Sequence, residues 1–267
     1  MFHVSVIMND TPSRYKPLET ERGLSMLVEY NKTKILFDTG YDDKFIKNAR
    51  KMGYNMNDLT AVVLSQAHFD HAAGYNILLE RNLAPKNLFI GSDFFEPKFI
   101  KNGLVFSNLA SSLEREKIVK HKITPKVVHL EQKLSNDFYL ITCSDTSPYA
   151  IEPPATTLKY NGKVFVRDNF IDEIALVADI PEGLVVLTGS CNKGICNVVH
   201  YIRKNTRKPI AAIIGGMHPT FSNRELSFLE ESGVKLIGIC NEKCSIENLP
   251  RTKINIIKVS VGDEFFF

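Results

Sequence analysis

Short apolar runs separated by polar turns dominate this chain, and most of them have the length and residue types of β-strands. Loose alternation over residues 2–9 predicts an opening strand. The apolar runs 24–30 and 34–38 flank a short polar turn, which predicts a hairpin. Two aspartates at 42–43 precede apolar residues at helical spacing, so we expect a helix from there to about Met52.

After this start, strands and helices alternate to the end of the chain. A buried strand is expected at 61–65 and a helix at about 72–81. Later helices are expected at about 195–204 and after Ser222, which has the spacing of a helix cap with a glutamate three residues on. Apolar runs predict further strands at 87–91, 126–130, 138–142, 163–166, 174–178, 184–188, 210–214, 234–240 and 254–259. No linker separates these elements, so we predict one domain over 1–267, with two mixed sheets and helices outside them.

Two parts of the chain have no clear place in this pattern. The segment 92–124 is irregular and rich in Phe and Lys, although Ser111 and Glu114 have the spacing of a capping box that opens a short helix. We expect this segment to form either a lid over a substrate pocket or a solvated peripheral insertion. The acidic pair Asp172 and Glu173 has no evident partner and is predicted to lie in a solvated turn.

Polar turns follow four of the predicted strands, at 38–40, 65–71, 189–194 and 215–218. In sheets built from alternating strands and helices, ligands bind outside the carboxyl ends of the strands. We therefore expect these four turns to meet at one edge of the molecule and to form a site for a small-molecule substrate.

The composition is that of an ordinary globular protein, and it narrows the choice of partner. The 267 residues are 44% hydrophobic and 24% charged, with a net charge of +3. Nucleic-acid binding is not expected, because it requires a concentrated basic surface. No apolar stretch approaches the ~20 residues of a membrane helix, so we expect no membrane partner. The N-terminus has no secretion signal and the five cysteines follow no disulfide pattern, which predicts a cytoplasmic location.

The stretch from Leu64 to His71 contains the closest grouping of candidate metal-binding side chains in the sequence. It reads Leu-Ser-Gln-Ala-His-Phe-Asp-His, so that His68, Asp70 and His71 fall within four positions at the end of a predicted buried strand. Neutral imidazole nitrogens and carboxylate oxygens are ligands for zinc, iron and manganese. The spacing predicts a divalent-metal site, and an incidental cluster is the alternative.

Several separated motifs, taken in order, resemble those of the metallo-β-lactamase superfamily. The stretch 64–71 resembles the superfamily motif Ser-His-x-His-x-Asp-His, and residues 36–40, Leu-Phe-Asp-Thr-Gly, resemble its strand-end Asp turn. The turns at 189–195, 215–218 and 239–242 are similar to those of a branch that contains dihydropterin synthase-like proteins and metal-dependent hydrolases. The resemblance implies an α/β fold, a four-layer αββα sandwich in which two mixed sheets are flanked by helices and the active site lies at one edge.

Three histidines of the family pattern are replaced in this chain. The resemblance places Gln66, Asn192 and Ile239 where the family has metal-binding histidines. Amide oxygens are weak ligands and isoleucine cannot coordinate a metal, so we do not expect the usual pair of ions. The trio of the 64–71 motif is left to hold a single zinc, manganese or iron ion, and the alternative is that no metal binds.

The same resemblance implies roles for residues around the motif. Asp70 is expected to be a ligand and a proton acceptor, and His218 an acid or a contact for an anionic group. Asp38 is expected to orient a motif histidine from outside the ligand set, with a turn-capping aspartate as the alternative. Cys191 and Cys240 lie next to lost ligand positions, where each is either a thiolate ligand or a bystander.

The sequence therefore predicts an enzyme, a metal-dependent hydrolase of the metallo-β-lactamase fold with an altered metal site. Its expected substrate is a small molecule, with a phosphoester as the candidate class, attacked by a metal-activated water. The alternative is a catalytically inactive family member that binds a small ligand in the retained pocket.

Overall fold

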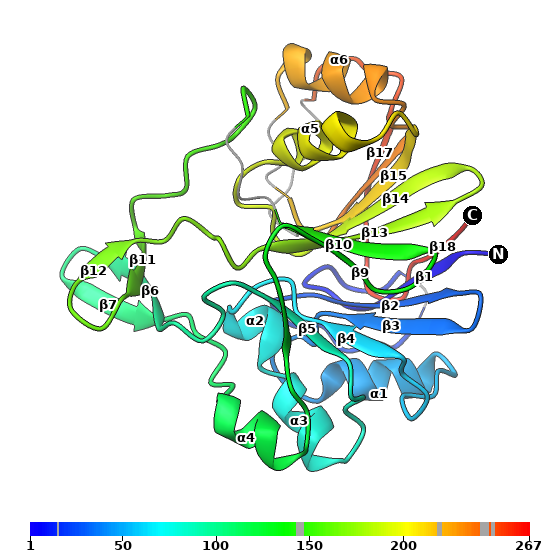
Figure 1. Ribbon diagram of the computed structural model, residues 1–267. Helices are drawn as coiled ribbons and strands as arrows, with labels where there is room; N and C mark the ends of the chain where they lie inside the picture. The colour runs from blue at the N-terminus through cyan, green and yellow to red at the C-terminus, as the bar shows by residue number, and fades with distance from the viewer. Residues whose placement is uncertain (15, 143–146, 218–220, 241–245, 247–248) are drawn as a thin grey trace.

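Two seven-stranded sheets stack face to face, and helices cover both outer faces of the stack (Figure 1). The structure is a computed structural model that describes residues 1–267 except 15, 143–146, 218–220, 241–245 and 247–248. This arrangement of helix, sheet, sheet and helix confirms the four-layer αββα sandwich predicted from the sequence.

The first sheet combines an antiparallel half with a parallel half. Its strands, in spatial order, are β18 (Glu264–Phe266), β1 (His3–Met8), β2 (Ser25–Tyr30), β3 (Thr33–Phe37), β4 (Ala61–Val63), β5 (Leu88–Gly91) and β8 (Lys126–Val128). The hairpin of β2 and β3 is antiparallel, as expected, and β3, β4, β5 and β8 run parallel. Its outer face is covered by α1 (Lys44–Lys51), α2 (Phe69–Ala72), α3 (Tyr75–Glu80) and α4 (Arg115–Lys120).

The second sheet is built in the same way. Its strands, in spatial order, are β17 (Asn255–Lys258), β16 (Leu236–Ile239), β15 (Ile210–Gly215), β14 (Gly183–Thr188), β13 (Ile174–Ile180), β10 (Phe138–Thr142) and β9 (Glu131–Lys133). The strands β14 to β17 run parallel, while β13 and β10 are antiparallel to their neighbours. Its outer face is covered by α5 (Ile195–Asn205) and α6 (Asn223–Glu231).

Fully apolar runs explain why the central strands lie where they do. Every residue of β14 and β15 is buried, because these strands have one face against the first sheet and the other against α5 and α6. Side chains such as Phe37 and Leu176 fill the space between the two sheets. The cap predicted for α6 is confirmed: the Ser222 hydroxyl accepts from the Glu225 amide, and the Glu225 carboxylate accepts from the Ser222 amide.

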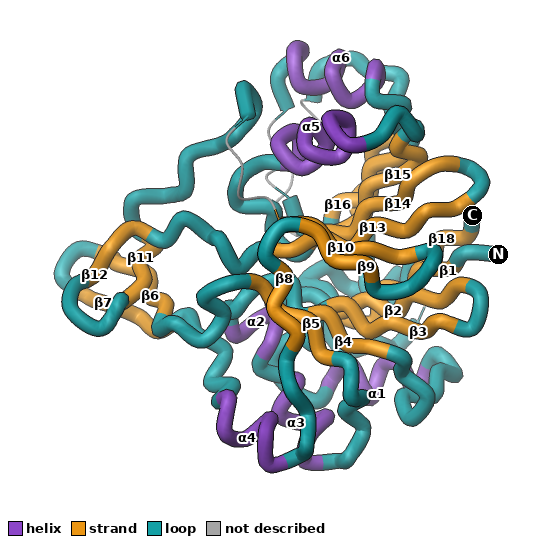
Figure 2. Tube along the Cα trace, viewed as in Figure 1, coloured by secondary structure: helices purple, strands orange, loops and turns teal. Residues whose placement is uncertain are grey.

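A third, four-stranded sheet projects from the sandwich and holds much of the irregular segment 92–124 (Figure 2). Its strands, in spatial order, are β12 (Phe165–Arg167), β11 (Thr157–Tyr160), β6 (Lys98–Asn102) and β7 (Val105–Asn108). Sequence reasoning missed β6 and β7 because β7 is exposed along its whole length and shows no apolar alternation. The capping box predicted at Ser111 is wrong, since α4 begins at Arg115 and Glu114 is its N-cap residue.

The parallel strands bring their carboxyl ends to one edge of the sandwich. Asp38 follows β3, the 64–71 motif follows β4, and Ser190 lies just after β14. These are the polar turns that the sequence pattern predicted to meet, and the site is built from them. None of the helices in the described ranges is both long and apolar enough to cross a membrane.

Candidate functional site

A cavity of about 270 Å³ lies at this edge, with mostly polar residues in its wall. Its lining residues are Asp10, Arg22, Gly23, Leu24, Asp70, His71, Gly189, Ser190, Asn192, Gly216, Met217 and Cys240. The predicted turns 65–71, 189–194 and 215–218 all contribute to this lining, and the turn 38–40 supports it from behind. The segment 92–124 contributes no lining residue, although its end contacts the motif where Leu109 accepts a hydrogen bond from the Phe69 amide.

Asp38 anchors the site from a fully buried position behind the cavity. Its carboxylate accepts hydrogen bonds from the Ser65 amide and from the Ser65 hydroxyl, both at 2.7 Å. Its backbone adopts a φ of +59°, a left-handed conformation that aspartate tolerates better than most residues. The turn that carries Ser190 fits closely against this pair, because a Cβ atom at Gly189 would lie 1.9 Å from the Ser65 hydroxyl oxygen.

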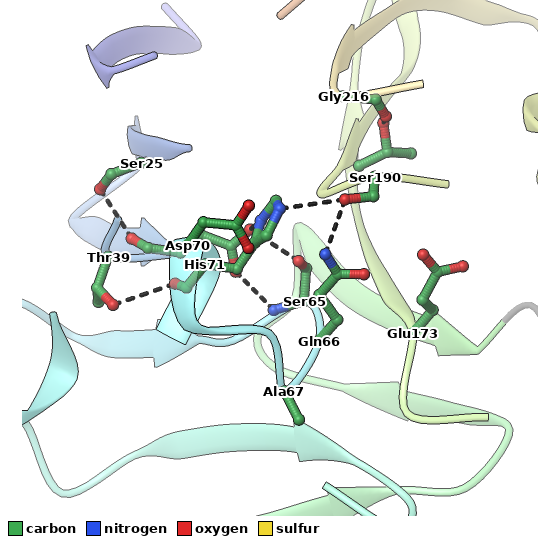
Figure 3. A network of polar contacts seen from close by, with 12 residues as sticks. Ser25, Thr39, Ser65, Gln66, Ala67, Asp70, His71, Glu173, Ser190 and Gly216 are labelled. Atoms are coloured by element: carbon green, nitrogen blue, oxygen red, sulfur yellow. Dashed lines mark hydrogen bonds and ion pairs between the residues drawn. The ribbon is translucent and has the colours of Figure 1, made fainter. Parts of the chain in front are cut away.

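His71 lies between Asp38 and Ser190, with a partner on each ring nitrogen (Figure 3). Nδ1 is 2.7 Å from Asp38 Oδ2, and Nε2 is 3.1 Å from the Ser190 hydroxyl oxygen. Burial by itself lowers the pKa of His71, but the charge and hydrogen bond of Asp38 outweigh it, and the pKa is raised. Asp38 therefore orients a motif histidine as the resemblance implied, although its role in a reaction stays a prediction.

A chain of amide and carboxyl groups continues from Ser190 away from His71. Gln66 Nε2 donates to the Ser190 hydroxyl at 2.7 Å, and Gln66 Oε1 accepts from Asn192 Nδ2 at 3.2 Å. Asn192 also donates two hydrogen bonds to the Glu173 carboxylate, one from its backbone nitrogen at 3.0 Å and one from its side-chain Nδ2 at 2.6 Å. Burial raises the pKa of Glu173 to about 7, against the lowering effect of these hydrogen bonds.

Asp70 faces the cavity and forms an ion pair with Arg22 at 2.9 Å. The loop of Arg22 packs directly on α2, because a Cβ atom at Gly23 would lie 1.8 Å from the Asp70 carbonyl oxygen. Burial alone would raise the pKa of Asp70, but the charges of His71, His68 and Arg22 lower it. Asp70 is thus held as a carboxylate, while the guanidinium of Arg22 lies at the cavity mouth with 73% of its side chain exposed.

His68 has a different environment from His71, although only two residues separate them. Its ring packs edge-on against Phe170 at a centroid distance of 5.8 Å, and its Nε2 is buried with no hydrogen-bond partner in the described structure. Burial lowers the pKa of His68 to about 4, so the ring is neutral. His68 is not among the residues that line the cavity.

These surroundings test whether the predicted trio fits a metal ion. Within the described ranges, no group of three His, Cys, Asp or Glu side chains is arranged to hold one. The three predicted ligands have separate surroundings here: the His68 ring packs on Phe170, the Asp70 carboxylate pairs with Arg22, and both nitrogens of His71 have hydrogen-bond partners. The single-metal site at these residues stays a prediction.

Three other predicted positions lie in buried, largely apolar surroundings. Ile239 is fully buried in the apolar layer between the second sheet and its helices. Cys191 and Cys240 are buried, and burial raises the pKa of the Cys240 thiol, which disfavours the thiolate that a metal requires. His218, predicted to be catalytic, lies outside the described residues.

Sequence reasoning missed four residues of the site. Arg22 was within a segment treated as a loop, and Ser190 was noted only as part of a turn. Asp172 and Glu173 were predicted to be solvated, but both are buried: Asp172 accepts from the Ala67 amide and from Lys98, and Glu173 accepts from Asn192. The position of this acidic pair, directly before the apolar run of β13, was the one feature of the sequence that could have indicated that both carboxylates are buried.

Comparison with known proteins found a family model and two relatives in sequence. A model of the metallo-beta-lactamase superfamily matches residues 19–137. A 7,8-dihydropterin-6-methyl-4-(beta-D-ribofuranosyl)-aminobenzene-5'-phosphate synthase of Methanocaldococcus jannaschii is 28% identical over 262 residues, which cover 91% of this chain and 87% of the relative. An uncharacterized protein of the same organism is 25% identical, over 80% of this chain and 78% of its own length.

Solved structures share the fold over the full chain. A metal-dependent hydrolase of the beta-lactamase superfamily superposes with a TM-score of 0.79 at 24% identity, covering 100% of this chain and 99% of that one. A metallo-beta-lactamase fold protein from Bacillus subtilis superposes with a TM-score of 0.57 at 14% identity, covering 100% of both chains. At these identities the likeness shows a common fold.

Proposed function

We propose that this chain, which resembles the metallo-beta-lactamase superfamily over residues 19–137 and shares its fold, is a hydrolase of a small phosphoester, which it binds in the polar cavity at the sandwich edge. The described side chains do not make up a metal-holding group. The proposal therefore rests on the acid, base and anion-binding groups of the chain itself.

The observation that carries the proposal is the meeting of Arg22, Asp70 and His71 in one cavity. Arg22 presents a guanidinium, whose planar fork binds phosphate oxygens in pairs. His71 presents an imidazole, the side chain most often used for proton transfer, and the charge of Asp38 raises its pKa. The cavity therefore offers both a group that can bind an anion and a group that can carry a proton.

Two further facts support the substrate class. The cavity volume of about 270 Å³ suits a small molecule. The relative from Methanocaldococcus jannaschii is named for a product that carries a 5'-phosphate, and it is 28% identical to this chain. These facts favour a phosphorylated substrate over an uncharged one.

The test is turnover of two chromogenic substrates, p-nitrophenyl phosphate and bis(p-nitrophenyl) phosphate. Each is measured with the purified protein in chelator, in added zinc and in added manganese. We expect turnover of at least one substrate, and a marked rise in KM for Arg22→Ala, which removes the guanidinium from the cavity mouth. The absence of turnover under all three conditions would contradict the proposal.

A second candidate function is a non-catalytic receptor for a small anion. It is favoured by the contact between Gln66 and Asn192, whose amides occupy positions where the family pattern has histidines. Titration calorimetry with a non-hydrolysable phosphonate separates the two functions. Binding that weakens in Arg22→Ala, together with no turnover of either chromogenic ester, would favour the receptor.

A further inference from the structure

Three side chains of the site lie in the order carboxylate, imidazole and hydroxyl. Asp38 Oδ2 is 2.7 Å from His71 Nδ1, and His71 Nε2 is 3.1 Å from Ser190 Oγ (Figure 3). They come from the ends of β3 and β14 and from α2, so only the folded chain brings them together. Both distances are within hydrogen-bond reach, and the two contacts use opposite nitrogens of the ring.

The two end groups favour one tautomer of the neutral His71 ring. An ionised carboxylate can only accept hydrogen bonds, so His71 Nδ1 carries the proton that it donates to Asp38. In that tautomer Nε2 has a lone pair and accepts the proton of the Ser190 hydroxyl. Gln66 Nε2 donates to the same hydroxyl oxygen at 2.7 Å, which leaves the single Ser190 proton directed at His71.

This is the arrangement by which a serine hydroxyl becomes a nucleophile. We propose that Ser190 is the nucleophile of this enzyme, with His71 as its general base and Asp38 as the residue that positions His71. The proposal rests on the proposed hydrolase function and adds a covalent intermediate to it. The structure also places both reacting groups where a ligand can reach them, because His71 and Ser190 line the cavity.

The supporting groups hold this geometry rigidly. Ser65 gives Asp38 two hydrogen bonds, and the Asp38 carboxylate is fully buried, so its orientation is set before any substrate binds. Gly189 allows the turn that carries Ser190 to pack against Ser65, since the Cβ atom of any larger residue would collide with the Ser65 side chain.

The step conserves atoms and electrons without an added reactant other than water. Ser190 Oγ attacks phosphorus and forms the Oγ–P bond as the bond from phosphorus to the leaving oxygen breaks. The Ser190 proton moves to His71 Nε2 and then to the departing alcohol. Water next attacks phosphorus and gives a proton to His71 Nε2 as the Oγ–P bond breaks. Nε2 then passes that proton to Oγ, which regenerates the serine hydroxyl and the neutral histidine and releases phosphate or a phosphomonoester.

The lone pair on His71 Nε2 cannot accept the Ser190 proton and coordinate a metal ion at the same time. His71 Nε2 accepts the Ser190 proton, and a metal ion would need that lone pair for coordination. The proposal therefore requires His71 to be free of metal during the reaction, and a chelator is expected to leave the serine reactive.

A fluorophosphonate probe tests the proposal without knowledge of the natural substrate. It forms an Oγ–P bond with an activated serine and releases fluoride, and peptide mapping by mass spectrometry locates the adduct. We expect one adduct per chain, on Ser190, formed equally in buffer and in chelator. An adduct elsewhere, or none, would overturn the proposal, and this result comes from the unmodified protein.

Variants then assign the roles. Ser190→Ala should abolish labelling, and His71→Gln should slow it by about 100-fold or more, the usual contribution of a general base. Asp38→Asn should lower the maximal labelling rate, because the asparagine amide would favour the other tautomer of the His71 ring. The probe concentration that gives half of the maximal rate should change little. Ser107→Ala, at an exposed position of the projecting sheet, is the matched control and should label normally.

The two proposals fail in different ways. Turnover of phosphoesters without labelling, with full activity in Ser190→Ala, would overturn the serine mechanism and leave the hydrolase function standing. Labelling at Ser190 without turnover of any phosphoester would support the nucleophile and contradict the proposed substrate class.

Discussion

Gln66 and Asn192 are 126 residues apart in sequence, yet Asn192 Nδ2 lies 3.2 Å from Gln66 Oε1. The family resemblance assigns histidines to both positions, so two altered ligand positions are also neighbours in space. The pair is tied to Ser190 on one side and to Glu173 on the other. Amide hydrogen bonds thus link the two strand ends at a place where the family pattern has metal ligands.

This contact predicts that metal binding can be restored in part. The double variant Gln66→His with Asn192→His adds two imidazoles that are close enough to share an ion, and zinc should bind more than about tenfold tighter than to the unmodified protein. Zinc content after dialysis, measured by elemental analysis, checks this. Equal zinc content in the double variant and the unmodified protein would show that the backbone at the two turns does not support coordination.

Glu173 should make the protein less stable as the pH rises. Burial raises its pKa from the ordinary value of 4.5 to about 7, so the folded state holds the proton more tightly than the unfolded chain. This contribution to stability is complete below about pH 4.5 and is lost as the pH passes 7, with an upper limit of about 3 kcal/mol. Urea unfolding at several pH values, compared with Glu173→Gln, measures it. A pH dependence that is identical in the variant would contradict the assignment.

Lys98 should be a large contributor to stability although it lies on the projecting sheet. It is 1% exposed, and its ammonium group lies 2.7 Å from Asp168 and 2.8 Å from Asp172. Lys98→Met leaves two buried carboxylates without their cation, which should cost about 3–5 kcal/mol of unfolding free energy. Lys101→Met on the same strand is exposed and serves as the control, with an expected change below about 0.5 kcal/mol. Similar losses in both variants would rule out this role for the buried pair.

Gly189→Ala should disrupt the site while the rest of the sandwich stays folded. The added methyl group would lie 1.9 Å from the Ser65 hydroxyl, so the Ser190 turn must move away from Asp38 and His71. We expect labelling of Ser190 by a fluorophosphonate to fall at least about tenfold, because a nucleophile displaced from its base loses general-base catalysis. The control is Gly103→Asn, where the backbone has a φ of +61° and an added Cβ meets open space. Unchanged labelling in Gly189→Ala would mean that the turn tolerates a larger residue.

The sequence predicted the sandwich well because its signals are local. A few adjacent residues are enough to recognise the apolar runs of β14 and β15 and the Ser222 cap of α6. The strands β6 and β7 were missed because they are held by pairing with each other and with β11, and β7 is exposed throughout. Their pairing depends on tertiary contacts that no local pattern shows.

The site was predictable in position but not in its contacts. Polar turns at the strand ends located the cavity, and Asp38 was expected beside a motif histidine, which it is. The trio of the 64–71 motif suggested a metal cluster because its residue types suit one, whereas the side chains face different partners. Ser190 gave no signal of its own, since its meaning depends on a histidine 119 residues away in sequence.

The central claim is that hydrolysis in this cavity is carried out by Ser190 and His71. The most direct measurement is turnover of bis(p-nitrophenyl) phosphate in chelator, for the unmodified protein and for Ser190→Ala, with metal content recorded in the same samples. We expect turnover that persists in chelator and is lost in Ser190→Ala. Turnover that disappears with chelator, returns with zinc and survives in Ser190→Ala would contradict it.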